Sequence, residues 1–365
     1  MANSTGWFWA ACLLLAGSAS MAAEPAGGHV PAEVQPEFTI PGTDGRSLQI
    51  GLDARLWAIP YLGADAALEN GDPANSIGWR ARSAKVGLLA HLSPKLQVIA
   101  VLDPLAEGDA LADLRLRYRW RRSITLGFGT SEVPYLASNL LTANHQKFAD
   151  HALSTGELAI GERLGVTGEG RYFGGKLGWI LGVYNGSESS QSNDGGGLMQ
   201  AFRLVTQPLG ELAARVPGPF RYRLGGGGVY GAGPSVDTLA YSVDLSAEMG
   251  GWKLRAEYLR DTRSPQAQPS LPPTSLGEVS REVMLAELSG FVAGRWLEAA
   301  LRVEEYDDNL NSEDFGDQLI VTGGFNAYCL RGALRTQLNY LHRREQAGTI
   351  ELDNDSVIFS LATSF

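Results

Sequence analysis

Hydrophobic and polar residues alternate along most of this chain, in short runs that are separated by polar or glycine-containing connections. A period of two places successive side chains on opposite faces, as in a β-strand, whereas a helix repeats its apolar positions every three to four residues. No long run has the helical repeat, and we predict sixteen strands. They start near Ser47, Ile77, Pro94, Ala110, Ser123, Glu157, Gly175, Gly196, Phe220, Val236, Trp252, Arg281, Arg295, Asp317, Gly332 and Asp353.

The connections between these strands alternate in length. Every second connection is tight, such as "SP" at 93–94 and "GG" at 174–175, and the others are mostly long and polar, such as "SESSQSNDG". Short turns at one end, long loops at the other and an even strand number are typical of outer-membrane barrels. We therefore predict an all-β fold, a 16-stranded antiparallel transmembrane β-barrel over residues 47–365, with short periplasmic turns and long extracellular loops.

Aromatic residues near the strand ends fit this fold, because membrane barrels carry aromatic girdles at both interfaces. The aromatic residues that we assign to the girdles are Trp57, Trp79, Trp120, Trp179, Trp252 and Tyr258.

The stretch "DLRLRYRWRR", residues 113–122, indicates which face of a strand is wet. Arginines occupy every second position, and leucine, tyrosine and tryptophan lie between them. An arginine that faces hydrocarbon at mid-depth costs roughly 2–4 kcal/mol, so the arginines are expected to line the lumen. The same parity predicts these pore-lining, anion-binding residues: Arg55, Arg80, Arg82, Arg115, Arg117, Arg119, Arg121, Arg221, Arg223, Lys253, Arg255 and Arg335. Lys85 falls on the wrong face, which requires a bulge or an interfacial position.

Acidic side chains share the lumen face, although basic residues outnumber them there. The formal net charge is -10, but most of the excess negative charge lies in the predicted loops. Cations in a narrow channel with low-dielectric walls favour anions, and arginine binds phosphate or carboxylate in bidentate fashion. Alternatively, the arginines pair with the acids and brace the wall. The predicted lumen acids are Asp53, Asp113, Asp244, Glu257, Glu298 and Glu304.

The two ends of the chain carry features of export and membrane assembly. The N-terminus has an apolar centre followed by small residues, and Ser20 and Ala22 fit the cleavage rule, although no Lys or Arg precedes the centre. We predict a signal peptide over 1–22, a flexible periplasmic lead-in over 23–46 and location in a bacterial outer membrane. The final strand alternates up to Phe365, as in barrels that the barrel assembly machinery recognises.

The connection over residues 131–156 is the longest and least polar of the long loops. Its leucine and phenylalanine residues are unusual for a solvated loop, so we predict that it folds into the lumen and forms the constriction. Lys147, His145 and His151 are then candidate contacts for passing anions. His145, Asp150 and His151 suggest a metal site, but no further well-spaced ligand set supports one, and we predict no metal.

Motifs for catalysis are sparse. "GGGG" at 225–228 lies in a strand run without a following helix or a Lys-Ser/Thr pair, so it is not a phosphate loop. Nothing marks a nucleophile elbow or a paired base. We predict no catalytic residue, no cofactor and no nucleic-acid partner, with an outer-membrane hydrolase as the enzymatic alternative.

Several segments occur in a recognisable order: "IGWRARSAKVGLLAHLSPKLQVIAVLD", "LRLRYRW", "ITLGFGTSEVPYLASNLLTANHQKFADHAL" and "GERLGVTGEGRYFGGKLGWILGVYNG". In these segments the chain resembles the phosphate-selective porin O and P family. The resemblance implies a homotrimeric outer-membrane porin in which an arginine ladder leads anions to a lysine-lined constriction. The ladder carries over to Arg115, Arg117, Arg119, Arg221 and Arg223, with Arg80 and Arg82 as second-strand members. The constriction lysines carry over poorly, because the chain has five lysines and one of them lies in the loop.

We therefore expect a passive diffusion channel in the outer-membrane lipid for small anions such as phosphate or for small polar solutes. A general or organic-solute porin without phosphate selectivity is the alternative.

Overall fold

The computed structural model describes residues 38–42, 46–63, 77–105, 111–140, 146–152, 157–186, 197–212, 218–232, 236–265, 277–312, 316–329, 334–346 and 352–364. Each of the sixteen predicted strands is present, and the largest displacement of a start is from Glu157 to Glu162. The strands are β1 (Phe38–Pro41), β2 (Ser47–Leu62), β3 (Gly78–Ser93), β4 (Leu96–Leu102), β5 (Leu111–Arg121), β6 (Ile124–Glu132), β7 (Glu162–Tyr172), β8 (Leu177–Asn185), β9 (Leu198–Thr206), β10 (Arg221–Ala232), β11 (Val236–Met249), β12 (Trp252–Pro265), β13 (Val279–Ala293), β14 (Leu297–Asp307), β15 (Gln318–Cys329), β16 (Leu334–Glu345) and β17 (Ser356–Ser364).

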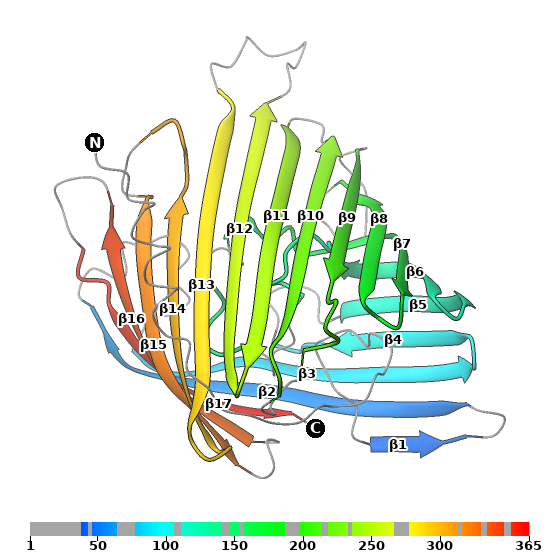
Figure 1. Ribbon diagram of the computed structural model, residues 1–365, viewed down its shortest axis with the longest axis horizontal. Helices are drawn as coiled ribbons and strands as arrows, with labels where there is room; N and C mark the ends of the chain where they lie inside the picture. The colour runs from blue at the N-terminus through cyan, green and yellow to red at the C-terminus, as the bar shows by residue number, and fades with distance from the viewer. Residues whose placement is uncertain are drawn as a thin grey trace.

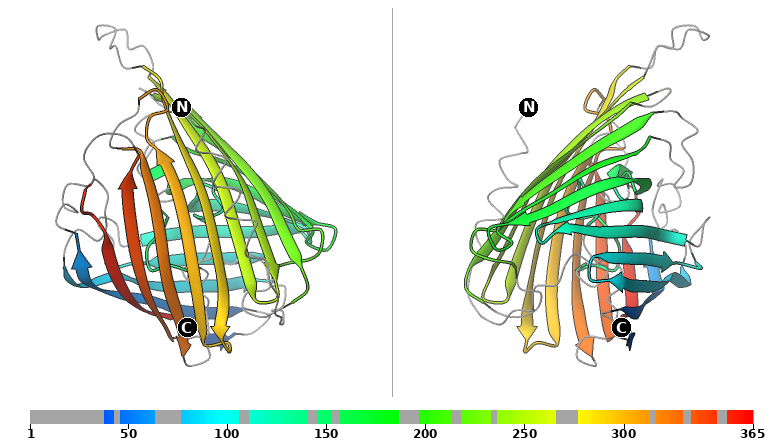
Figure 2. Two further views of the ribbon diagram at one scale, coloured as in Figure 1. Left: turned by 60° about the vertical axis from the view of Figure 1, so that its left-hand side comes forward. Right: turned by 90° about the vertical axis from the view of Figure 1, so that its right-hand side faces the viewer.

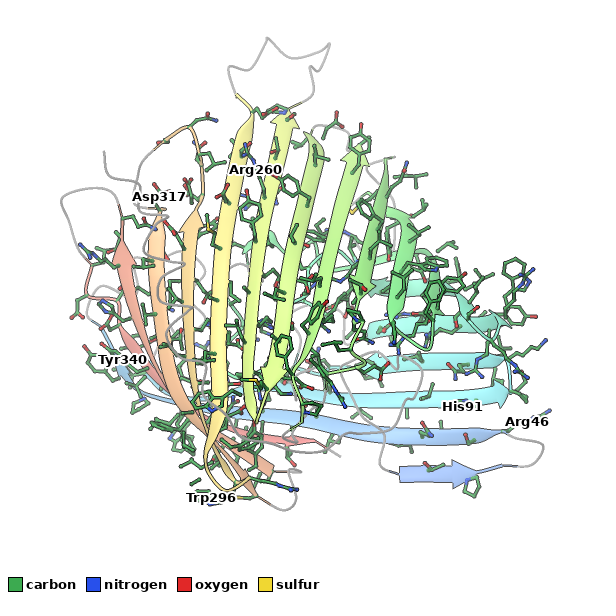
Figure 3. The ribbon with its side chains drawn as sticks, viewed as in Figure 1. Arg46, His91, Arg260, Trp296, Asp317 and Tyr340 are labelled. Atoms are coloured by element: carbon green, nitrogen blue, oxygen red, sulfur yellow. The ribbon has the colours of Figure 1, made fainter. Side chains whose placement is uncertain are left out.

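Strands β2 to β17 form a closed barrel (Figures 1 and 2), shown with its side chains in Figure 3. Each strand pairs antiparallel with the next one, and β17 closes the ring by pairing with β2. This is the predicted 16-stranded antiparallel transmembrane β-barrel. Within the described ranges, none of the helical segments has the length and apolar character of a membrane span.

The two faces of β5 differ as its period of two predicts. Leu114, Leu116 and the aromatic residues that follow are 41–53% exposed on the outer surface. Asp113 and Arg117, on the other parity, are buried. Because the outer surface of a membrane barrel meets hydrocarbon, this arrangement keeps the charges away from lipid. All six predicted lumen acids are buried as well.

The aromatic residues divide between the two surfaces. Trp79 and Trp120 are exposed on the outside, as expected for a girdle. Trp57 is 1% exposed, and its assignment to the girdle is wrong. It lies on the same face of β2 as Asp53 and Arg55, which point inward. Its position in the strand therefore places it inside the barrel, although tryptophan is common at membrane interfaces.

A β-bulge explains the awkward position of Lys85. Arg55 pairs with Ser83 and Leu56 pairs with Ala81, so Arg82 is an extra residue in β3. One extra residue inverts the facing of the side chains that follow it. Lys85 therefore returns to the inner face, so of the two alternatives, a bulge or an interfacial position, the structure shows the bulge.

The short strand β1 lies within the segment that we predicted to be a flexible lead-in. It pairs antiparallel with the first residues of β2, from Phe38 opposite Ile50 to Pro41 opposite Ser47. β17 pairs with the remainder of β2 and reaches Asp53. The two ends of the chain therefore share β2 as a partner and follow one another along it.

The tight turns use conformations that favour glycine. Gly174 and Gly175 have φ angles of 66° and 88° between β7 and β8, and Gly250 and Gly251 have 63° and 88° between β11 and β12. A residue with a Cβ adopts positive φ only at a cost, so these glycines keep the turns short at one end of the barrel.

Candidate functional site

The connection from β6 to β7 turns into the barrel and packs against its inner wall (Figures 1 and 2). We call the described parts of the predicted loop 131–156, residues 131–140 and 146–152, the inner loop. Leu136 and Phe148 are buried in it, with 0% and 2% exposed. Its apolar residues are thus satisfied by contacts with inward-facing aliphatic residues of the wall.

Tyr135 fixes the first part of the inner loop. Its carbonyl oxygen accepts a hydrogen bond from Arg203 Nη1 at 3.0 Å and another from the Ser242 hydroxyl. A Cβ on Gly227 would lie 2.7 Å from the same oxygen. One glycine of the 225–228 run thus makes room for the loop backbone, which gives this run a structural role.

The carboxylate of Glu257 on β12 forms the next anchor. It accepts hydrogen bonds from the backbone N–H groups of Ala137 at 2.6 Å and Ser138 at 3.0 Å. Glu257 is buried, so these charge-assisted bonds form in a region of low dielectric constant. They fix the loop backbone at the point where it crosses the lumen.

The second part of the inner loop is held by polar side chains of β14 to β16. Lys147 Nζ lies 2.6 Å from Glu298 Oε1, and Asn326 donates to the Lys147 carbonyl at 2.9 Å. Arg335 donates to the Gln146 carbonyl at 2.6 Å. Lys147, predicted to contact anions, is therefore engaged with the wall.

Arg302 of β14 contacts the end of the inner loop. It donates to the carbonyls of Asp150 and His151, and its guanidinium lies 4.8 Å from the centre of the Phe148 ring. Enclosure by the barrel, followed by the charge of Arg55 and other cations, lowers the pKa of His151 to about 3. Its imidazole is consequently neutral near pH 7.

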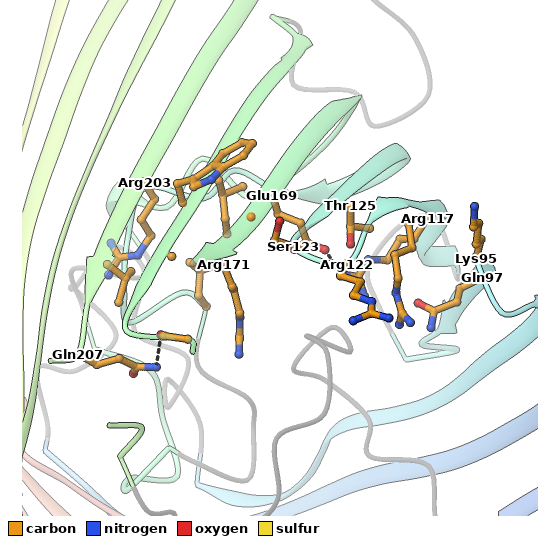
Figure 4. Close-up of a pocket in the computed structure, with 18 of the residues that line it drawn as sticks. Lys95, Gln97, Arg117, Arg122, Ser123, Thr125, Glu169, Arg171, Arg203 and Gln207 are labelled. Atoms are coloured by element: carbon orange, nitrogen blue, oxygen red, sulfur yellow. Dashed lines mark hydrogen bonds and ion pairs between the residues drawn. The ribbon is translucent and has the colours of Figure 1, made fainter. Parts of the chain in front are cut away.

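These anchors lie mainly on β10 to β16, and the wall from β2 to β10 borders a cavity of 540 Å³ (Figure 4). Ala137 and Leu140 of the inner loop form its other side. Seven basic side chains and one acidic side chain, Glu169, line it within the described residues. We call this space the basic cavity; its basic residues are Lys95, Arg117, Arg119, Arg122, Arg171, Arg203 and Arg223.

Some of these cations are neutralised by neighbours. Arg117 forms an ion pair with Glu169, and Arg203 forms one with Asp244. Arg171 Nη1 lies 3.0 Å from a Glu211 carboxylate oxygen.

Three other cations of the cavity have no acidic side chain paired with them in the described residues. Lys95, Arg119 and Arg122 form no ion pair within the part of the chain that the structure describes, and all three are exposed to solvent. They supply most of the uncompensated positive charge of the basic cavity.

The predicted pore-lining residues are only partly brought together. Arg117, Arg119 and Arg223 line the basic cavity. Arg115 lies on the same strand, 2.9 Å from an Asp113 carboxylate oxygen.

The other predicted residues lie outside the cavity lining. Arg255 and Lys253 pair with acids at 3.3 and 3.9 Å, Arg82 lies over the Trp57 ring and Arg121 over the Trp120 ring. His145 lies outside the described residues, and no cluster of three or more His, Cys, Asp or Glu suited to a metal is present in the described ones. The remaining ones outside the lining are Arg55, Arg80, Arg221, Arg335, Lys147 and His151.

Sequence reasoning missed Arg203, Lys95, Arg122 and Arg171 as lining residues. Arg203 alternates with Phe202 and Leu204, so the parity rule used for the other arginines would have placed it on the lumen face. Lys95 and Arg122 lie in tight turns, where the period of two does not apply.

No protein-family model matches the sequence, and no curated protein matches it either. Solved structures do match. An outer-membrane-expressed OmpT of Vibrio cholerae has a TM-score of 0.60 at 10% identity over 89% of this chain and 100% of that one. An anion-selective porin from Comamonas acidovorans has 0.57 at 13% over 88% and 100%. The outer-membrane protein opdK from Pseudomonas aeruginosa has 0.51 at 9% over 88% and 98%.

The closed barrel and the inner loop thus define the class: the chain has the fold of outer-membrane β-barrel porins. At these identities the likeness concerns the fold alone, and the solute must be inferred from the cavity.

Proposed function

We propose that this protein is a diffusion channel of a bacterial outer membrane that favours small anions. One observation carries the proposal: the basic cavity lies between the wall of β2 to β10 and the inner loop, and among the described residues seven cations and one acid line it. Positive side chains between low-dielectric walls focus the field and raise the local anion concentration. Permeation by diffusion needs no chemical step, so no catalytic residue or cofactor is part of the proposal.

The similar fold of an anion-selective porin supports this choice of solute charge. Phosphate remains a candidate solute on the resemblance to the phosphate-selective family. Two residues of the proposed arginine ladder, Arg115 and Arg117, are however paired with acids, which weakens their attraction for a dianion. A general or organic-solute porin is the second candidate, and the exposed charge of Arg119 and Arg122 favours anions in either case.

We also propose how the chain is exported, inserted into the membrane and assembled. Residues 1–22 act as the export signal, the barrel assembly machinery inserts the chain, and three copies form the working channel. An outer-membrane protein of Vibrio cholerae with a similar fold, OmpT, was solved in trimer form, which supports the trimer. The inner loop forms the constriction.

The reversal potential in a salt gradient across a planar bilayer tests the proposed anion preference. We expect the wild-type channel to prefer chloride over potassium, and Arg119→Gln with Arg122→Gln to lose most of this preference. Arg121→Gln is the matched control, because Arg121 lies over Trp120 and outside the cavity lining. Equal permeability of both ions in the wild type would reject the proposal.

A further inference from the structure

The basic cavity also has an apolar component. Leu89, Ile180 and Val205 of the wall line it together with Ala137 and Leu140 of the inner loop. The lumen of a porin is usually polar. Aliphatic side chains beside cations without acidic partners therefore point to a solute that has both a charged group and an apolar surface.

The wall residues face the cavity because of their strand parity. Val205 follows Arg203 by two positions on β9, and Arg203 is buried on the inner side. Leu89, 5% exposed, follows the buried Gly87 by two positions on β3. Cations and aliphatic residues thus belong to the same inward rows.

The loop residues are held in place from behind. Glu257 binds the backbone N–H groups of Ala137 and Ser138, so the loop presents its side chains from a fixed backbone. Leu140 lies three residues beyond Ala137 and is half-buried. The cavity therefore has a positioned apolar side opposite its basic wall.

We propose that the basic cavity selects organic anions, consisting of a carboxylate on a compact apolar body, over inorganic phosphate. This inference rests on the proposed function. The carboxylate binds at Arg119, Arg122 and Lys95, whose charges are free, and the apolar body lies along the aliphatic residues. Arginine suits a planar carboxylate because its guanidinium donates two parallel hydrogen bonds.

The amount of free charge and the space agree with this solute. Arg117 and Arg203 are paired with Glu169 and Asp244, which reduces the charge that could offset the dehydration of a phosphate dianion, whereas a monoanionic carboxylate needs less. A volume of 540 Å³ lies within the range of small-molecule sites, about 300–1,000 Å³. A single aromatic ring with a carboxylate fits such a space.

Bi-ionic reversal potentials with benzoate, acetate and phosphate, each against chloride, test the inference. We expect the wild type to pass benzoate at least as well as acetate, although benzoate is larger, and to pass phosphate less well. Leu140→Asn should lower the benzoate-to-acetate permeability ratio about threefold, because the apolar contact is lost. The chloride-to-potassium ratio should stay unchanged.

Two further variants serve as a second test and as a control. Val205→Thr keeps nearly the same volume and should act in the same direction, so a folding defect of Leu140→Asn would leave the test intact. Leu310→Asn is the control, because Leu310 is exposed in the β14–β15 connection, outside the cavity lining. An anion-selective channel whose benzoate-to-acetate ratio is the same in all variants would overturn this inference alone. A channel without anion preference would overturn the proposed function.

Discussion

The ammonium nitrogen of Lys147 lies 2.6 Å from Glu298 Oε1, and this ion pair joins the inner loop to β14 across 151 positions of sequence. Both side chains are nearly buried, at 12% and 2% exposed. The Tyr328 hydroxyl donates to the other oxygen of the same carboxylate at 2.6 Å. The pair therefore belongs to a network that connects the loop with the wall.

Removing one member of this pair should loosen the loop. Lys147→Met leaves the Glu298 charge buried without its partner, and breaking a buried pair costs about 3–5 kcal/mol. We expect a lower free energy of unfolding in urea, and larger, noisier single-channel conductance. Lys147→Met with Glu298→Gln should recover most of the stability, because the buried charge is gone. Equal stability of the single variant and the wild type would contradict this role.

The contact between the inner loop and β10 can be tested by substituting two neighbouring glycines. A Cβ on Gly227 would approach the Tyr135 carbonyl oxygen to 2.7 Å, whereas a Cβ on Gly226 would approach no atom closer than 3.4 Å. Gly227→Ala should displace the loop and change the conductance, at a cost of about 1–3 kcal/mol for overpacking. Gly226→Ala, with the same chemical change, should leave conductance unaltered. A similar conductance in both variants would show that the contact does not position the loop.

The pH dependence of stability is tested at His151. The pKa of its imidazole is about 3 in the folded protein, whereas the ordinary value for a solvated histidine, as in the unfolded chain, is 6.5. Between these values the unfolded chain binds a proton that the folded one does not, so this contribution to stability is complete above about pH 6.5 and is lost as the pH falls toward 3. His151→Gln removes it. The stability of the variant relative to wild type should rise as the pH is lowered from about 7 to about 4, as measured by urea unfolding. A pH-independent difference would show that the two pKa values are equal.

The anion preference should depend on ionic strength. Lys95, Arg119 and Arg122 act on passing ions through exposed charges, and the screening length falls from about 10 Å at 0.1 M to about 3 Å at 1 M salt. We expect the chloride-to-potassium permeability ratio to decrease over this range at a constant gradient. A ratio that stays constant would indicate selection by close contacts instead of the field.

The sequence alone was sufficient for the features that follow from a period of two. Asp113 and Arg117 face inward and Leu114 outward because a membrane strand keeps charge away from hydrocarbon, and even the bulge beside Lys85 followed from this rule. Parity states on which face a residue lies but not which residue lies opposite.

The ion pairs Arg117–Glu169 and Arg203–Asp244 therefore had no local signature, since their partners are set by register between distant strands. For the same reason, the sequence did not predict which of the arginines remain unpaired. The sequence also did not show that Lys147 is paired with Glu298. The route of the loop across the lumen depends on contacts with strands more than a hundred residues away, and such contacts leave no local pattern.

The arrangement of β1 and β17 along β2 has a consequence for biogenesis. The β1–β2 hairpin needs local chain only, so it can form before the barrel closes, and it occupies Ser47–Ile50 while leaving the rest of the β2 edge vacant. An open strand edge can pair with wrong partners, and β17 covers this edge in the closed barrel. Because β1 already pairs with Ser47–Ile50, the pairing of β17 with β2 ends at Asp53, and this fixes the extent of the contact that closes the barrel.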